Sequence, residues 1–325
     1  MNPSVADVHV NQPLTSISLA YLQSQTRFVA DRVFPVVAVD KQSDRYYTYD
    51  RGDWNRNEMQ ERAPSTESAG SAYRLDNTPT YYCREYALHR DIPDQVVANA
   101  DSMLNPMRES TEYLTQKALI HREKLWAAAY FTTGKWTTDV TGVASGPTTG
   151  QFLQWNDASA KPIPQVRAAA TSILESTGFL PNVLVLGKRV YDALLDNPEI
   201  IDRIKYGQTA GGPALVNTNL LAQLFEVDRV EVMAGIENTA AEGKTATHSF
   251  ISGKGALLCY AAPSPGLMTP SAGYTFAWTR MGNAGQVIRE FRMDELKATR
   301  LEIETNFDQK LIAADLGYFF ATAVA

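Results

Sequence analysis

The sequence predicts an α+β fold built as two lobes, and three observations carry that prediction. The chain has 325 residues and 44% of them are hydrophobic, which is enough to bury a sizeable core in more than one compact unit. One long helical pattern begins at Pro106 and meets no further Gly or Pro until Gly134. Beyond it, helical and strand patterns alternate towards the end of the chain.

Residues 1–43 predict an extended arm, because Pro13 and Pro35 interrupt any long element. Residues 44–90 predict a long two-stranded excursion. Strand-like runs at 45–49 and 80–88 flank a polar tip rich in Gly, Pro, Ser and Asn, and Tyr, Trp and Arg concentrate throughout this segment. The excursion has little apolar sequence with which to build a core of its own.

An isolated two-stranded ribbon is marginally stable in water, so this excursion needs a second surface to cover it. Tyr, Trp and Arg are enriched at the centres of protein interfaces, which favours a neighbouring subunit as that surface. The alternative is that the aromatic side chains pack on the body of their own chain. The predicted intersubunit contacts are Tyr46, Tyr47, Tyr49, Arg51, Trp54, Arg56 and Arg62 on the excursion, with Phe28 and Phe34 on the arm.

The long helix has a clear start, because Asn105 is a good N-cap and Pro106 suits the first helical position. Apolar residues recur at helical spacing along one face, namely Met107, Leu114, Ala118, Leu125 and Ala129. The other faces are charged, with Arg108, Glu109, Glu112, Lys117, Arg122 and Glu123. The pattern predicts one amphipathic helix from Pro106 to about Phe131.

The second lobe is predicted as mixed helix and strand. A helix ends at Gly178, an apolar strand spans 182–186, and helices follow at 189–195 and 219–225. Near the end of the chain, Leu301, Ile303 and Thr305 alternate with charged residues, which predicts a half-buried strand that returns to the first lobe.

Composition argues against several classes of function. A net charge of −6 is not that of a chain that wraps DNA by charge, and no apolar stretch reaches the roughly 18 residues of a membrane span. Cys83 and Cys259 are predicted to be two buried free thiols. The four histidines (His9, His89, His121, His248) lack zinc-site spacing, and Gly243, Lys244 and Thr245 lack the preceding glycine of a phosphate loop. We therefore predict no catalytic residue, no metal and no cofactor.

Several segments, in this order, resemble the major capsid proteins of tailed bacteriophages with the Hong Kong 97-like fold. They are FPVVAVDKQSDRYYTYDRGDW, ERAPSTES, LPNVLVLGKRVYDALLDNPEIIDRIKYG, NLLAQLFEVDRVEVMAGIENTA, LLCYAAPSPGLMTPSAGYTF and NFDQKLIAADLGYFF. The resemblance covers most of the chain. It implies an N-terminal arm (1–43), an extended loop lying over the adjacent subunit (44–90), a peripheral domain (91–165) with a spine helix at about 106–131, an axial domain (166–290) and a return to the peripheral domain (291–325).

The resemblance also implies a structural protein that self-assembles through hexamers and pentamers into an icosahedral shell around double-stranded DNA, with the DNA contacted only weakly. Such a shell is assembled in the bacterial cytoplasm, with separate scaffolding, portal and decoration proteins as candidate partners and no membrane. The arm-like sequence begins almost at Met1, so any scaffolding segment is expected to be a separate protein or a piece already removed.

Some relatives lock their shells by an isopeptide bond from a loop lysine to a neighbouring asparagine. No lysine lies between Gln42 and Gln116, so we expect this shell to be held by noncovalent contacts. Two other readings stay open, an encapsulin-like host compartment with the same subunit fold and a soluble α/β enzyme.

Overall fold

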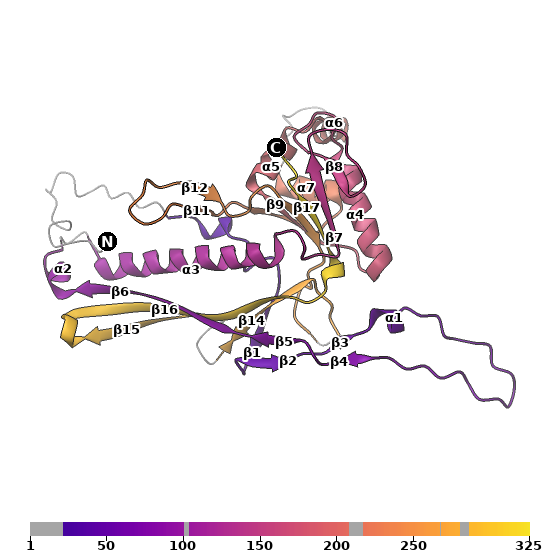
Figure 1. The fold of residues 1–325 in the computed structure, drawn as a ribbon, viewed down its shortest axis with the longest axis horizontal. Coiled ribbons are helices and arrows are strands. Elements are labelled where there is room, and N and C mark those ends of the chain that lie inside the picture. Colours follow the sequence, from indigo (N-terminus) through magenta and orange to yellow (C-terminus); the bar gives the residue numbers. More distant parts are fainter. Residues whose placement is uncertain (1–21, 101–103, 208–216, 267, 280–285) are drawn as a thin grey trace.

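The protein is described here from a computed structural model that covers residues 22–100, 104–207, 217–266, 268–279 and 286–325. The predicted arm residues 1–21, including Pro13 and His9, lie outside this part of the chain. The molecule is elongated, with a compact upper lobe at one end of a long flat body and a narrow loop that projects beyond the body (Figure 1).

The α-helices are α1 (Arg51–Trp54), α2 (Asp94–Ala98), α3 (Pro106–Tyr130), α4 (Pro162–Thr177), α5 (Lys188–Leu195), α6 (Pro198–Gly207) and α7 (Thr218–Phe225). Short 3-10 turns occur at η1 (Gln25–Arg27), η4 (Asp294–Leu296) and η5 (Ala314–Leu316). The predicted long helix is confirmed as α3, and the Asn105 side chain caps it by accepting from the amide of Arg108 at 3.1 Å.

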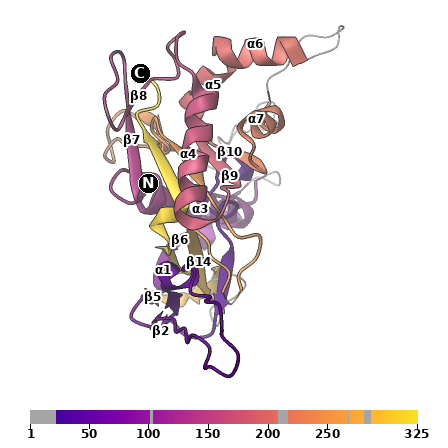
Figure 2. The ribbon, with the colours of Figure 1, turned by 90° about the vertical axis from the view of Figure 1, so that its right-hand side faces the viewer.

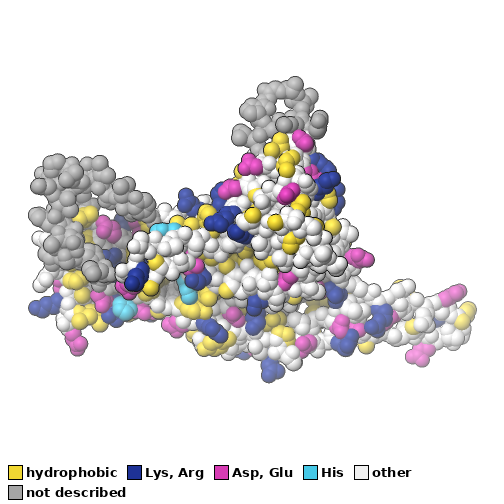
Figure 3. All heavy atoms as spheres, turned by 45° about the horizontal axis from the view of Figure 1, so that its top comes forward, with side chains coloured by type: hydrophobic (Ala, Val, Ile, Leu, Met, Phe, Trp, Pro, Cys, Tyr) yellow, Lys and Arg dark blue, Asp and Glu magenta, His cyan; other side chains and the backbone are white. Residues whose placement is uncertain are grey.

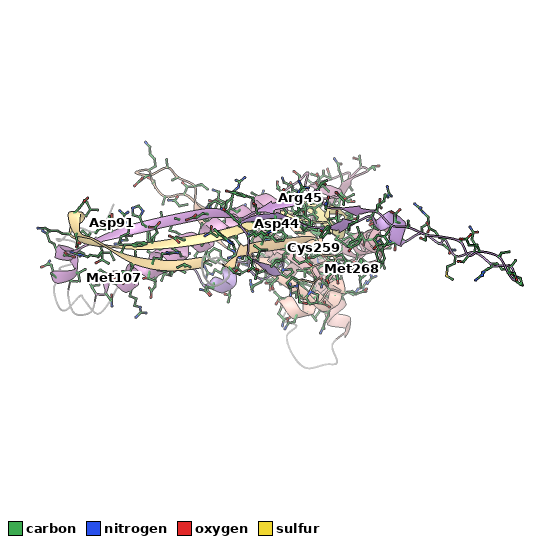
Figure 4. The ribbon with its side chains drawn as sticks, turned by 90° about the horizontal axis from the view of Figure 1, so that it is seen from below. Asp44, Arg45, Asp91, Met107, Cys259 and Met268 are labelled. Atoms are coloured by element: carbon green, nitrogen blue, oxygen red, sulfur yellow. The ribbon has the colours of Figure 1, made fainter. Side chains whose placement is uncertain are left out.

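The flat body is a five-stranded sheet that lies under α3. Its order is β1 (Val36–Val39), β14 (Gly273–Trp278), β16 (Ala298–Leu311) and β15 (Gln286–Met293), with β6 (Arg84–Pro93) pairing on the other side of β16. Seen from below, β6, β16 and β15 run side by side, with Asp91 and Met107 at one end and Asp44 and Arg45 towards the loop (Figure 4). The predicted alternation in β16 is confirmed, since Leu301, Ile303 and Thr305 are buried.

The upper lobe is a six-stranded sheet with helices packed against it. Its order is β10 (Arg229–Met233), β9 (Val183–Gly187), β13 (Ala256–Cys259), β17 (Gly317–Ala321), β7 (Thr138–Val143) and β8 (Gln151–Leu153). Every residue of β9 is buried, because helices cover one face of this strand and the arm and the end of α3 cover the other. Figure 2 shows α4, α5 and α6 stacked on the outside of this lobe.

The sheets do not follow the boundaries that the sequence suggested. From the predicted peripheral segments, β7, β8 and β17 all join the upper sheet, while β14 from the predicted axial segment joins the lower one. Strand patterns show which face of a strand is buried but not which strand becomes its partner, so the sequence could not place these crossovers. The assignment of the two lobes to peripheral and axial domains stays a prediction.

The arm ties the two sheets together. Its backbone contacts the edge of the upper sheet, where the amide of Ala234 donates to the carbonyl of Arg27 at 3.1 Å. A few residues later it becomes β1, which pairs in parallel with β14 in the lower sheet. Between these two points Phe34 packs against Trp126 and Tyr130 of α3, with ring centroids 6.2 and 4.7 Å away.

The predicted buried thiols are confirmed, since Cys83 and Cys259 have no exposed surface. Burial raises the pKa of Cys83 to about 11 and that of Cys259 to about 12. Both thiols therefore stay protonated and unreactive at neutral pH.

The contact of Phe34 with α3 leaves no room at Gly273 of β14. A Cβ atom there would lie 2.8 Å from the ring of Tyr130 and 3.1 Å from that of Phe34, both of which are buried. We expect Gly273→Ala to lower the free energy of unfolding by about 1–3 kcal/mol in urea titrations. Gly70→Ala, where a Cβ would meet nothing within 4 Å, is the matched control; an equal effect of the two substitutions would contradict this account.

Candidate assembly surface

The projecting loop is built on two short ladders that leave the body in sequence. The strand β2 (Ser43–Arg45) pairs with β5 (Thr80–Tyr82), and β3 (Thr48–Tyr49) then pairs with β4 (Leu75–Asp76). Residues 50–74 connect β3 to β4 and contain only the short helix α1. The predicted two-stranded excursion with an irregular tip is confirmed, but its predicted end at residue 90 is wrong, because residues from Arg84 onward belong to β6 and pair with β16 in the body sheet.

The loop buries almost nothing against its own molecule. No residue between 47 and 80 is buried, and every residue from 59 to 78 is exposed. Figure 3 shows it standing clear of the body, with hydrophobic and charged side chains of both signs on its surface. A segment of this length without a core is unstable as an isolated ribbon, so its conformation calls for another surface.

Three aromatic side chains form a cluster where the ladder ends. Tyr49, Trp54 and Tyr73 contact one another with ring centroids 5.7–6.0 Å apart, yet they remain 40%, 52% and 62% exposed. Tyr47 adds a further exposed aromatic ring on the loop, at 63%. We call Tyr49, Trp54 and Tyr73 the loop cluster.

Charged groups beside the loop cluster hold its shape. The Arg74 side chain donates to Asp53 at 2.9 Å, and the Arg74 amide donates to the same carboxylate at 3.0 Å. Asp50 also pairs with Arg74 and caps α1 by accepting from the amide of Gly52. The Arg74 hydrogen bond keeps the pKa of Asp53 below its ordinary value, so the pair persists at neutral pH.

The predicted arginine contacts make bonds within their own chain. Arg51 pairs with Asp315 at η5, which fastens the root of the loop to the body. Arg56 lies 3.3 Å from Glu58, and Arg62 donates to the carbonyl of Thr66 at 2.5 Å. All three arginines remain exposed, and their part in intersubunit contact stays a prediction.

The remaining predicted contacts divide into two groups. Tyr47, Tyr49 and Trp54 present open aromatic surface, as an interface residue must. Tyr46 instead stacks on Phe276 at 5.8 Å, and Phe28 and Phe34 are buried at 5% and 1% exposure. The structure corrects the expectation for Phe28 and Phe34, because both side chains fill the core of their own subunit and present almost no surface to a neighbour.

Sequence reasoning gave too little weight to Tyr73 and Arg74. The signal that could have found them is the hairpin register, since Tyr49 pairs with Leu75 and this brings the two residues before Leu75 beside α1. Sequence reasoning also placed Glu123 on a charged outer face of the long helix, whereas the side chain is completely buried.

The described residues meet the requirements of neither a metal site nor a membrane-spanning helix. They contain no group of three or more His, Cys, Asp or Glu placed to hold a metal ion. None of the helices in these ranges combines the length and hydrophobicity of a membrane span. The Gly243–Lys244–Thr245 segment lies in the connection between β11 (Ile236–Asn238) and β12 (His248–Phe250), where Gly243 makes a turn with φ 79°.

An enzyme site would need a concave pocket with convergent polar groups. A wide, open hollow of about 700 Å³ lies between the segment that precedes α4 and the start of α6, lined by Ser159, Lys161, Glu199, Asp202 and Arg203 among others. Its lining contains no His or Cys that could activate the Ser159 hydroxyl or act as a nucleophile. This hollow therefore gives no support to the enzyme reading.

Comparison with known proteins relates this chain to phage capsid proteins. The model of the family described as phage major capsid protein E matches residues 152–306. The major capsid protein of Pseudomonas phage JBD67 is 26% identical over 99% of both chains, and that of Burkholderia phage BcepMu is 23% identical over 96% of both. Both alignments include the arm and the projecting loop.

Solved structures agree on the fold. A phage-related protein of Bordetella bronchiseptica RB50 has a TM-score of 0.68 at 19% identity and 93% coverage of each chain. The capsid of Cyanophage P-SCSP1u has a TM-score of 0.59 at 11% identity, covering 99% of this chain and 95% of its own. The SrpI encapsulin of Synechococcus elongatus has a TM-score of 0.55 at 10% identity, covering 99% and 96%.

The chain therefore has the Hong Kong 97-like fold of shell-forming subunits, as predicted. Over 99% and 96% of its length it is similar to the major capsid proteins of two phages, which confirms the resemblance seen in the sequence.

The buried Phe34 and the exposed Trp54 are expected to contribute very differently to the stability of the subunit. We expect Phe34→Ala to lower the free energy of unfolding by about 3–5 kcal/mol, because it empties a space between Trp126 and Tyr130. Trp54→Ala, at an exposed position, is expected to change it by less than about 1 kcal/mol. Chemical denaturation of the two variants is the measurement. A large loss of stability for Trp54→Ala would mean that the loop cluster supports its own subunit.

Proposed function

We propose that this chain is a phage major capsid protein, a structural subunit whose copies form the shell of the virus particle. The observation that carries the proposal is the relationship to two phage major capsid proteins over 99% and 96% of the chain. The projecting loop, which its own subunit leaves unburied, is the physical counterpart of that relationship. A structural role of this kind implies that the chain is not an enzyme.

We propose further that the loop cluster contacts an adjacent subunit. Tyr49, Trp54 and Tyr73 contact one another and leave much of their ring surface open, so they offer a neighbour a contiguous aromatic surface to bury. Repetition of this contact around hexamers and pentamers would close an icosahedral shell from identical, modest interfaces. Tyr47, Arg51, Arg56 and Arg62 are proposed to lie at the rim of the same contact.

We extend the proposal to what the shell encloses and to the proteins that assemble with it. With a net charge of −6, the subunit is suited to enclosing double-stranded DNA with weak contact rather than gripping it. Assembly in the bacterial cytoplasm with separate scaffolding, portal and decoration proteins fits a phage capsid subunit. An encapsulin-like compartment is not favoured, because the encapsulin shares the fold at only 10% identity while the relatives matched along the whole chain are capsid proteins.

Electron microscopy tests the role of the loop cluster. We expect the wild-type chain to form closed particles in negative stain, whereas Trp54→Ala is expected to reduce the particle yield at least about tenfold, since truncating a central interface Trp costs about 2 kcal/mol or more per contact. Trp54→Phe keeps an aromatic ring and is the matched control. Normal particles from a folded Trp54→Ala subunit would remove the loop cluster from the interface.

The absence of lysine between Gln42 and Gln116 leads to a separate prediction. Assembled particles boiled in detergent are expected to run as a single band at the monomer mass of 35.9 kDa. Covalently linked ladders on the gel would show that this shell is crosslinked by other residues.

A further inference from the structure

A buried carboxylate fastens the arm to the middle of the molecule. Glu123 lies in the second half of α3 and has no exposed surface. Both of its carboxylate oxygens accept from the amide of Val29 at 3.0 Å, and one accepts from the amide of Ala30 at 2.8 Å. The two amides have no strand or helix partner here, so Glu123 supplies the acceptor that the arm backbone lacks.

The cations near Glu123 are engaged elsewhere. Arg122, the preceding residue on α3, pairs with Asp31 of the arm at 2.6 Å. Arg32 of the arm pairs with Glu231 of β10 at 3.1 Å, and Lys124 pairs with Glu237 of β11 at 2.7 Å. Within the described ranges, no Lys or Arg forms an ion pair with Glu123, which is therefore a buried acid held by backbone amides alone.

Burial and the amide hydrogen bonds shift the pKa of Glu123 in opposite directions, and burial has the larger effect. Burial raises the pKa of Glu123 from 4.5 to about 7, against the two amide hydrogen bonds, which lower it. Asp31 raises this pKa and Arg32 lowers it, both to a smaller extent. His121, two residues earlier, packs on Tyr86 at 4.7 Å, and burial lowers its pKa.

The raised pKa of Glu123 determines how the docking of the arm depends on pH. A carboxyl whose pKa is higher in the docked state contributes stability that is complete below its free pKa, near 4.5, and is lost as the pH rises through about 7. Docking of the arm should therefore be firm in mild acid and weaker above neutrality.

We propose that Glu123 is a protonation-controlled latch that holds the arm segment from Phe28 to Phe34 on α3 and loosens it at alkaline pH. The segment lies where α3, the edge strand β10 and the start of β1 meet, so loosening it would weaken one of the links between the upper and lower sheets. Side-chain contacts on either side of the latch would remain, since Gly235 packs against Phe28 and the Arg229 side chain donates to the carbonyls of Arg32 and Val33 at 3.0 Å. The latch thus adjusts docking rather than detaching the whole arm.

Hydrogen exchange of the full-length subunit, read by mass spectrometry on peptides that contain Val29 and Ala30, tests the latch. After correction for intrinsic exchange, protection of these amides is expected to fall about tenfold between about pH 6 and about pH 8.5. Glu123→Gln keeps an acceptor oxygen but cannot ionise, and its protection is expected to be the same at both pH values. Glu237→Gln, which removes a nearby carboxylate that does not touch the arm, should keep the wild-type dependence.

Two results would overturn the latch. One is wild-type protection that does not change across this range, a measurement that holds even if Glu123→Gln fails to fold. The other is a wild-type slope retained in a folded Glu123→Gln variant. Neither result bears on shell formation, so the latch and the proposed function can fail separately.

Discussion

The packing of Phe34 between Trp126 and Tyr130 is the contact on which the arrangement of this subunit depends. Both sheets meet there, because the arm reaches α3 from the edge of the upper sheet and leaves it as a strand of the lower one. The apolar contacts and the Glu123 carboxylate act on the same short segment, one by burial and one by hydrogen bonds. The two lobes also share an apolar core, in which residues of α3, β9, β13 and β17 pack together with this segment.

Local patterns in the sequence predicted much of this architecture. The N-cap at Asn105, the absence of helix breakers through α3 and the alternation in β16 are local signals, and each was confirmed. Strand partners are not local, which is why the placement of β7 and β17 in the upper sheet escaped the sequence analysis. Sequence patterns were enough to predict the fold class, whereas the lobe boundaries depend on which strands pair with one another.

The sequence located the projecting segment more accurately than it identified the individual residues of the candidate surface. An aromatic and arginine-rich ribbon was rightly expected to project, since nothing in its sequence could build a core. Burial of Phe28 and Phe34 depends on where the arm crosses α3, and burial of Glu123 depends on two amides about 94 residues away in the chain. Such long-range contacts leave no periodic trace in the sequence.

The position of β17 has a consequence for the order of events during synthesis. This strand comes from residues 317–321, yet it lies in the interior of the upper sheet between β13 and β7. Residues up to Ala321 must therefore leave the ribosome before that sheet can become continuous, and β7 is made about 170 residues before its partner β17. Until β17 is made, the upper lobe of a nascent chain lacks the strand that joins β13 to β7.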